Sequence, residues 1–332
     1  MLFEPFTLKK TTFKNRIVLP PMCMYQADDE GHANDFHVIH YGSMALGGPG
    51  LILVEATAVS PNGKISSNDL GIWSDDHIEG LKRISDAIRK QGSIPGIQIN
   101  HAGRKSKTEE PWAPSALAFD GNHLVPKEMT IDDINETIMA FQKAAQRANQ
   151  AGFDVLEIHA AHGYLIYQFL SPLTNQRVDR YQNHGQFLVD ITEAISNVWP
   201  KDKVLAVRIS ATEYAQGGVT PTMASAVLNR LKAFGMDLID VSSGGNQIVK
   251  IPIYPGYQLG LAKIIKEETG LPVIGGGLIE HLTMAEYAVS AQQCDFVYLG
   301  RALLRNPHLI LNQAKEVGYD IAYPEPYQRG KK

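Results

Sequence analysis

The sequence predicts an α/β protein folded as a single (β/α)8 TIM barrel. Eight short apolar segments alternate along the chain with amphipathic segments of helical periodicity, a pattern typical of a parallel sheet covered by helices. Eight strands close such a barrel, and 332 residues are enough for one with insertions. Because no linker or break in composition divides the chain, we expect one domain over residues 1–332.

Each expected strand is a short apolar run bounded by glycine, proline or polar residues. In chain order, these runs are Arg16–Leu19, Gly50–Glu55, Pro95–Asn100, Asp154–Ile158, Val204–Ile209, Leu238–Val241, Pro272–Ile274 and Phe296–Leu299. In a barrel of parallel strands all eight carboxyl ends meet at one mouth, and the chemistry of these barrels is found there.

Helices are expected between the strands, and several have recognisable ends. The helical patterns are Asp76–Gln91, Ile131–Ala151, Thr222–Phe234, Gly256–Thr269 and Leu282–Ser290. Thr130 stands as an N-cap before the second pattern. Gly152 follows the same pattern, as a left-handed C-cap does.

Two segments lie outside the repeat. Leu2–Lys14 has alternating apolar positions and is expected to form a hairpin that caps the bottom of the barrel. Ser106–Met129 follows the third strand and carries three prolines. A loop of that length in a compact domain is usually functional, so we interpret it as a lid.

Composition narrows the class of protein. The formal net charge is −4 and no long basic run occurs, which disfavours nucleic-acid or polybasic membrane binding. No apolar stretch reaches the roughly 18 residues of a spanning helix, and the first residues do not resemble a secretory signal. Two cysteines, Cys23 and Cys294, are too few for a disulfide framework or a Cys-rich metal site. We expect a cytoplasmic enzyme.

The end of the fourth strand carries the densest group of reactive side chains. His159, His162 and Tyr164 follow directly after a buried run. A His-x-x-His pair can bind a metal, can form part of a hydrogen-bonded core, or can bind a substrate oxygen beside a phenol. The local sequence leaves these three interpretations open.

Glycines after the last two strands indicate a phosphate site. Gly277 ends a triple glycine after the seventh strand, and Gly300-Arg301 follows the eighth. This is where phosphate binds in many such barrels, and Arg301 could add a charge-assisted hydrogen bond.

Two further polar residues lie within otherwise apolar strands. Arg208 needs an anionic partner, which is either an internal carboxylate, Glu55 or Glu157, or negative charge on a cofactor. Gln98 is either a core amide with satisfied hydrogen bonds or a hydrogen-bond partner of a heteroaromatic ring.

Together these motifs resemble the old yellow enzyme family of FMN-dependent NAD(P)H oxidoreductases, in its bacterial branch with a cysteine near the flavin. The resemblance runs from Phe3 to Arg329. The motifs are Pro-Met-Cys-Met-Tyr at 21–25, Gly-Ile-Trp-Ser-Asp-Asp-His at 71–77, His-Ala-Gly-Arg-Lys at 101–105 and Glu-Ile-His-Ala-Ala-His-Gly-Tyr at 157–164.

The resemblance implies a role for each motif residue. The flavin ring would be lined by Pro20, Pro21, Met22, Cys23 and Ala56, with Gln98 and Arg208 at its polar edge. The phosphate would be held by Gly277, Gly300 and Arg301. His159 and His162, helped by Tyr25, would bind the substrate's carbonyl oxygen, and Tyr164 would donate the proton.

The implied activity is reduction of the C=C bond of α,β-unsaturated carbonyl compounds, with NADPH or NADH as reductant, FMN as cofactor and no bound metal. Quinones and nitro compounds are further expected substrates. Arg329 would reach into a neighbouring subunit's active site, which implies a homodimer or homotetramer. The segment 180–185 is shorter than the family pattern. The alternatives are an aldolase barrel that uses the His pair or Lys105, and a non-catalytic flavin-binding barrel.

Overall fold

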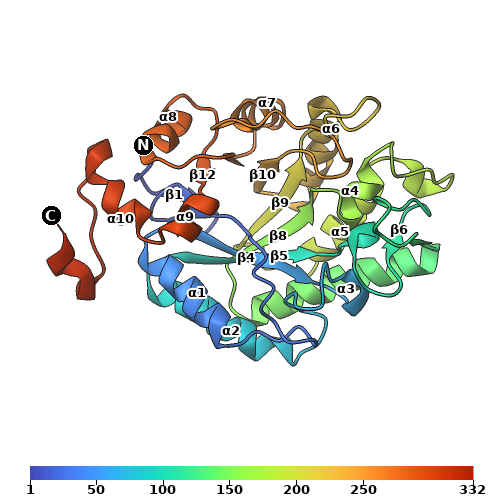
Figure 1. Cartoon of the computed structure of the whole chain (residues 1–332), viewed down its shortest axis with the longest axis horizontal. Helices are drawn as coiled ribbons and strands as arrows, with labels where there is room; N and C mark the ends of the chain where they lie inside the picture. Colours follow the sequence, from blue (N-terminus) through green and yellow to red (C-terminus); the bar gives the residue numbers. More distant parts are fainter. Residues whose placement is uncertain (332) are drawn as a thin grey trace.

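The computed structural model describes residues 1–331 and contains a closed barrel of eight parallel strands. In spatial order the strands are β10-β11-β12-β3-β4-β5-β8-β9 (Figure 1). Their bounds are β3 Ile17–Leu19, β4 Leu51–Ala58, β5 Ile94–Asn100, β8 Val155–Ala160, β9 Val204–Ser210, β10 Leu238–Ser242, β11 Val273–Gly275 and β12 Phe296–Tyr298. Each of the eight expected strands is confirmed, and the fold is the expected (β/α)8 barrel.

Helices surround the barrel. They are α1 Asp35–Leu46, α2 His77–Lys90, α3 Ile131–Gln150, α4 Leu165–Leu170, α5 Gln186–Ser196, α6 Pro221–Leu231, α7 Leu259–Thr269, α8 Leu282–Ser290, α9 Arg301–Arg305 and α10 Leu309–Gln313. The five expected helices are confirmed, although α7 begins later than expected. Gly256 has φ +79°, which places it in a turn before the helix.

The N-terminal hairpin closes the bottom of the barrel. Strands β1 (Phe6–Leu8) and β2 (Thr11–Phe13) pair antiparallel. The buried Phe13 ring lies 5.1 Å from the Phe296 ring at the start of β12. Phe13 also joins an interior cluster built from the amino-terminal halves of the strands, including Val18, Leu51 and Val204. The hairpin cap is therefore confirmed, and the bottom of the barrel is packed with apolar side chains.

The base of the long loop after β5 is held by strand pairing and by hydrogen bonds. Its two ends pair as short strands, β6 (Trp112–Ala113) and β7 (Lys127–Glu128). The buried Arg177 donates hydrogen bonds to the carbonyls of Pro114 and Met129, at 3.2 and 2.6 Å. The part of the loop between these strands lies above the barrel mouth, since its Phe119 contacts Lys105, which follows β5.

The pairing of β4 with β5 contains a bulge beside the mouth. The register shifts between Val54 and Thr57, which leaves Glu55 and Ala56 outside the regular ladder. Such a bulge re-aims the side chains that it contains. Within residues 1–331, the structure has no helix that is both long enough and apolar enough to cross a membrane.

Candidate active site at the barrel mouth

His159 is a neutral hydrogen-bond donor at the end of β8. It is 3% exposed, and burial lowers its pKa well below the ordinary value, helped by the nearby His162 and Arg208. Its Nδ1 accepts a hydrogen bond from the Ala161 N–H at 3.2 Å. The single proton of the neutral ring therefore lies on Nε2.

His162 is held by a strained backbone and by a serine. Its φ of +56° is left-handed, and its N–H donates to Ser210 Oγ at 3.0 Å. Its Nε2 lies 2.7 Å from Ser242 Oγ, which also accepts from Gln258 Nε2 at 3.2 Å. With the Ser242 hydroxyl as donor to His162 Nε2, the ring proton lies on Nδ1.

Tyr164 completes the cluster as a protonated phenol. Its ring lies 4.9 Å from the His159 ring, edge to face, and the two histidine rings are 5.2 Å apart. Burial raises the Tyr164 pKa above its ordinary value. Three of the residues implied by the resemblance are therefore brought together, each with a proton to donate.

Lys105 holds the loops of this cluster together. Its Nζ donates to the carbonyls of His162 at 3.0 Å and Gly245 at 3.1 Å, and it lies 5.1 Å from the centre of the Tyr164 ring. Burial lowers its pKa to about 8, and the neighbouring Arg104 adds to that effect. Because the amine is committed to two backbone carbonyls, it is poorly placed to form a Schiff base as an aldolase would require.

The segment after β3 lines the mouth from the other side. The Cys23 pKa is raised by burial and by the nearby carboxylate of Glu55, so the thiol stays protonated. Its sulfur hydrogen-bonds to the Ala56 backbone and to the side chain of Tyr25. Tyr25 has a left-handed φ of +54°, is 45% exposed, and burial of its ring raises its pKa to about 12.

Beneath the mouth lies a layer of buried polar side chains. Gln98 Nε2 donates to Glu157 Oε1 at 2.8 Å, so its Oε1 is left to accept from another group. Arg208 Nε lies 3.2 Å from Asp240 Oδ2. The internal partner of Arg208 is therefore Asp240 rather than Glu55 or Glu157, because β9 and β10 pair with Arg208 and Asp240 in register.

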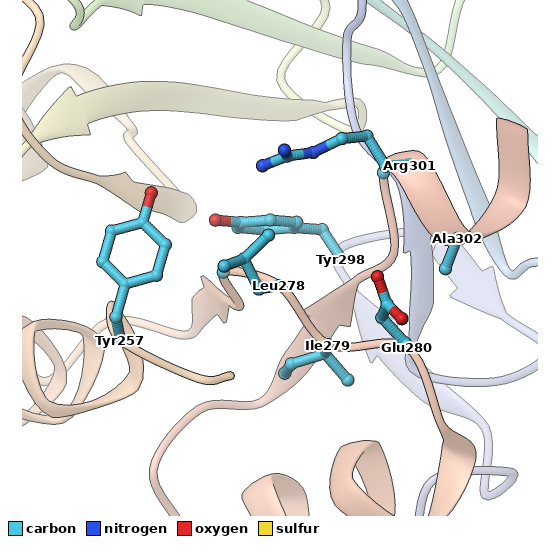
Figure 2. Close-up of a pocket in the computed structure, with 9 residues that line it drawn as sticks. Tyr257, Leu278, Ile279, Glu280, Tyr298, Arg301 and Ala302 are labelled. Atoms are coloured by element: carbon cyan, nitrogen blue, oxygen red, sulfur yellow. The ribbon is translucent and has the colours of Figure 1, made fainter. Parts of the chain in front are cut away.

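The glycines after β11 and β12 form a small pocket. It is lined by Tyr257, Gly277, Leu278, Ile279, Glu280, Tyr298, Gly300, Arg301 and Ala302. In Figure 2 the Arg301 guanidinium extends above the Tyr298 ring, and the Tyr257 hydroxyl points toward the same space. A Cβ on Gly277 would lie 2.8 Å from the Tyr257 ring. Only glycine therefore leaves its backbone open to a ligand here.

The mouth fits FMN on the observations of this structure. A glycine-lined pocket with Arg301 suits a phosphate, and Arg208 Nε is buried without a hydrogen-bond acceptor of good geometry among the described residues. These two arginines would hold the cofactor, with its phosphate at Gly277 and Arg301.

Several contributors to the site were not predicted from the sequence. Tyr257, Gln258 and Tyr298 lie between the phosphate pocket and His162, and the Tyr298 hydroxyl donates to Gln258 Oε1. Tyr298 and Asp240 each lie at an inward position near the end of a strand, so alternation along the strand was the signal that could have found them.

Arg329 is not brought to the mouth of its own barrel. It lies in the exposed 3-10 segment Glu325–Gly330, part of the C-terminal stretch that lies to the left of α10 and outside the barrel in Figure 1. The preceding residues 322–326 line a groove with Lys90 and Gly92 at the end of α2. Because α2 runs antiparallel to the strands, its end lies at the bottom of the barrel.

The chain matches known proteins over nearly its whole length. The model of the NADH:flavin oxidoreductase / NADH oxidase family matches residues 1–318. An NADPH dehydrogenase of Clostridium acetobutylicum is 49% identical over 335 residues, covering 99% of this chain and 98% of that protein. An NADPH dehydrogenase of Bacillus subtilis is 44% identical, with the same coverage of 99% and 98%.

Solved structures agree with these sequence matches. Morphinone reductase superposes with a TM-score of 0.82 at 26% identity, covering 98% of this chain and 91% of that one. The old yellow enzyme homologue from Zymomonas mobilis gives 0.82 at 26% identity, with 99% and 98% covered. The resemblance drawn from the motifs is confirmed, and the chain belongs to the old yellow enzyme (NADH:flavin oxidoreductase / NADH oxidase) family, an enzyme that uses FMN as cofactor and a nicotinamide dinucleotide as reductant.

Proposed function

We propose that this enzyme reduces the C=C bond of α,β-unsaturated carbonyl compounds with NADPH as reductant, and that residues 1–332 act as one FMN-binding unit. The observation that carries the proposal is the cluster of two neutral imidazoles and one protonated phenol at the mouth. Quinones and nitro compounds, which are also electrophiles with acceptor oxygens, fall within the same proposal. The names of the relatives as NADPH dehydrogenases support NADPH as the reductant.

The cofactor supplies hydride transfer when bound, and the protein supplies binding, orientation and electrostatics. Pro20, Pro21, Met22, Cys23 and Ala56 would line its ring, Gln98 and Arg208 would contact the polar edge, and Gly277, Gly300 and Arg301 would hold its phosphate. Arg208 brings a positive charge, and Gln98 Oε1 brings an acceptor, to the layer beneath the mouth.

The two histidines act on the substrate's carbonyl oxygen. His159 offers its Nε2–H and His162 its Nδ1–H, and a donor aimed at an oxygen that becomes negative stabilises the transition state. Because both rings are neutral, they can donate these hydrogen bonds without transferring a proton. The Tyr25 hydroxyl, at the rim of the mouth, is a third donor to the same substrate.

Tyr164 donates the proton that saturates the double bond. A phenol with a raised pKa keeps its proton at neutral pH and releases it only to a strong base, such as the α-carbon of an enolate. The Lys105 ammonium 5.1 Å from the ring centre favours the phenolate that forms afterwards.

The test measures two half-reactions separately, the oxidation of NADPH and the reduction of the enone. For Tyr164→Phe we expect NADPH consumption in a single anaerobic turnover to stay within about twofold of the parent, because this half needs no proton from the phenol. We expect reduction of cyclohexenone to slow by about 10² to 10⁴-fold, the usual contribution of a general acid. Stopped-flow absorbance under anaerobic conditions measures both rates.

Tyr167→Phe is the matched control. Tyr167 is a buried tyrosine three residues further along, and its hydroxyl has no hydrogen-bond partner among the described residues. We expect this variant to keep both rates. Equal losses in both halves for Tyr164→Phe would contradict the proton-donor role, and a preparation that neither contains nor binds FMN would contradict the whole proposal.

A further inference from the structure

We propose that Glu157 is a neutral carboxylic acid in the folded enzyme, and that Asp240 alone carries the negative charge that balances Arg208. Glu157, Arg208 and Asp240 are here called the buried triad. With one proton on Glu157, the triad has no net charge, and Asp240 is the positioning residue that keeps the Arg208 guanidinium in place beneath the mouth. This inference rests on the proposed contact between Arg208 and the cofactor.

The triad is built from three neighbouring strands. Glu157 lies on β8, Arg208 on β9 and Asp240 on β10, and Arg208 pairs in register with Asp240 on one side and with His159 on the other. Glu157 and Asp240 are 0% exposed, and Arg208 is 7% exposed. Water therefore cannot solvate an extra charge on either carboxyl.

The contacts of the two carboxyls differ. Asp240 Oδ2 lies 3.2 Å from Arg208 Nε, whereas the hydrogen-bond partner of Glu157 is the uncharged Gln98 amide at 2.8 Å. Glu157 Oε2 and both Asp240 oxygens have no hydrogen-bond partner among the described residues. A close cation is therefore what can offset the cost of burying a carboxylate here. Asp240 has the closer cation, so the proton belongs on Glu157.

The charges around the triad also favour a proton on Glu157. Burial raises the Glu157 pKa well above its ordinary value, and the Asp240 charge raises it further, against the opposing effect of Arg208. Burial also raises the Asp240 pKa, but Arg208 is the main opposing influence there. Two buried carboxyls that share one guanidinium cannot both ionise without cost, and one of them keeps a proton.

The other titratable groups facing the triad supply no second counter-charge. His159 is neutral. Tyr298, whose ring centre lies 5.6 Å from the Arg208 guanidinium, is a phenol with a raised pKa, because it is buried. Tyr257 is likewise a phenol whose pKa is raised by burial. Within the described residues, Arg208 is the cation that acts on the pKa of Glu157 and Asp240.

The charge state has a consequence for the cofactor. A neutral triad presents a guanidinium whose charge is already partly balanced by Asp240. Replacing Glu157 by Gln would exchange one neutral group for another of the same shape. Replacing Asp240 by Asn as well, in the double variant Glu157→Gln/Asp240→Asn, would leave one uncompensated positive charge beside the cofactor, because no carboxyl of the triad remains to ionise. The single and the double variant are therefore expected to behave differently.

The first experiment measures the midpoint potential of the bound cofactor by anaerobic titration in the holoenzyme. We expect Glu157→Gln to match the parent and the double variant Glu157→Gln/Asp240→Asn to have a more positive potential, because the added positive charge favours the more negative, reduced cofactor. A shift in Glu157→Gln as large as the shift in the double variant would overturn the assignment of the proton.

The second experiment does not depend on where the cofactor binds. Denaturant unfolding of the parent and Glu157→Gln is compared between pH 5 and pH 7. A folded-state pKa above the unfolded value means that unfolding releases the proton above about pH 4.3, so stability falls as pH rises. We expect the unfolding constant of the parent to rise about tenfold per pH unit relative to Glu157→Gln. Parallel pH curves would overturn the proposal.

Infrared difference spectroscopy gives a third readout, which also decides the matter if the double variant does not fold. We expect the C=O band of a protonated carboxylic acid in the parent to be absent from Glu157→Gln. Persistence of that band would overturn the proposal. If the band and the pH curves behave as expected but the double variant leaves the potential unchanged, the contact between Arg208 and the cofactor is overturned instead.

Discussion

The position of the His162 ring at the mouth depends on three contacts with other parts of the chain. Its left-handed φ of +56° costs free energy for a residue with a Cβ. Its N–H, ring and carbonyl are held by Ser210, Ser242 and Lys105 respectively. These three contacts come from three different loops or strands, and together they keep the ring beside His159.

Glu55 organises the segment that carries Tyr25. Its Oε2 accepts from the Met24 N–H at 2.7 Å and its Oε1 from the Tyr41 hydroxyl at 3.2 Å. Burial raises the Glu55 pKa to about 7, against the lowering effect of these hydrogen bonds, and the nearby Asp69 raises it further. His37, whose own pKa burial lowers to about 4, does not supply a positive charge at neutral pH.

This shift predicts a pH dependence of stability. A folded pKa of about 7 exceeds the ordinary value of 4.5, so the contribution of the neutral form is full below about pH 4.5 and is lost as the pH rises through 7. We expect the parent to lose on the order of 3 kcal/mol relative to Glu55→Gln between pH 4.5 and 8. Urea unfolding across this range measures the difference, and curves that stay parallel would refute it.

At the scale of elements, the mouth depends on two loops that touch through their backbones. Gly163 follows β8 and Gly245 follows β10, with φ of +71° and +93°. A Cβ on Gly163 would lie 2.5 Å from Asn246 Cα, and one on Gly245 would lie 2.7 Å from His162 Cα. The two loops can approach this closely only because both positions are glycine.

Gly245→Ala should therefore damage both stability and activity. The added methyl meets backbone atoms that cannot move aside, and the residue must keep a left-handed φ, so we expect a loss of about 2 kcal/mol or more in the free energy of unfolding. We also expect kcat/KM with an enone to fall, because His162 shifts. Denaturant unfolding and steady-state kinetics measure the two effects.

Gly260→Ala is the control for this prediction. Gly260 lies on α7 with no atom within 4 Å of the added Cβ, and alanine favours a helix over glycine by up to about 1 kcal/mol. The control should be neutral or slightly more stable. If Gly245→Ala behaves in the same way, the close approach of the two loops does not control the site.

The helices show where sequence patterns are informative. The helix α3 was predicted because its buried positions are apolar or small and its N-cap is Thr130. The helix α1 was not predicted. Its buried residues include His37 and Tyr41, which weaken the apolar stripe that periodicity detects. The reason for their burial, the contact with Glu55 on β4, is a tertiary one.

At the scale of the whole molecule, closure of the barrel confines the chemistry to one end. The bottom is filled by Phe13 and the apolar amino-terminal halves of the strands. The mouth collects His159, Arg208 and the glycines after β11 and β12. A ligand can therefore enter only from the mouth, where the loop after β5 lies.

The assembly is a proposal at this scale. Because Arg329 lies at the far end of its own barrel, it can act on a substrate only in another copy of the chain, and we propose a homodimer or homotetramer in which it does so. We expect Arg329→Ala to raise KM for an enone several-fold without releasing FMN. Lys331→Ala, two residues away, is the control. Sedimentation and kinetics test both claims, and a monomer with unchanged KM would contradict them.

The sequence by itself determined the elements and the position of the site. Apolar runs of strand length, helical periodicity and polar residues at strand ends are local properties, so they predicted eight strands, the mouth and the side chains gathered there. His159, His162 and Tyr164 were recognised because they are close together along the chain.

Only the tertiary structure decided the partners of these residues. Arg208 pairs with Asp240 rather than Glu55 or Glu157, His162 with Ser242 at a separation of 80 residues, and Lys105 with Gly245 at 140. Contacts of this kind join residues far apart in the chain. Which of them form is set by strand register and by the loops that meet once the barrel closes.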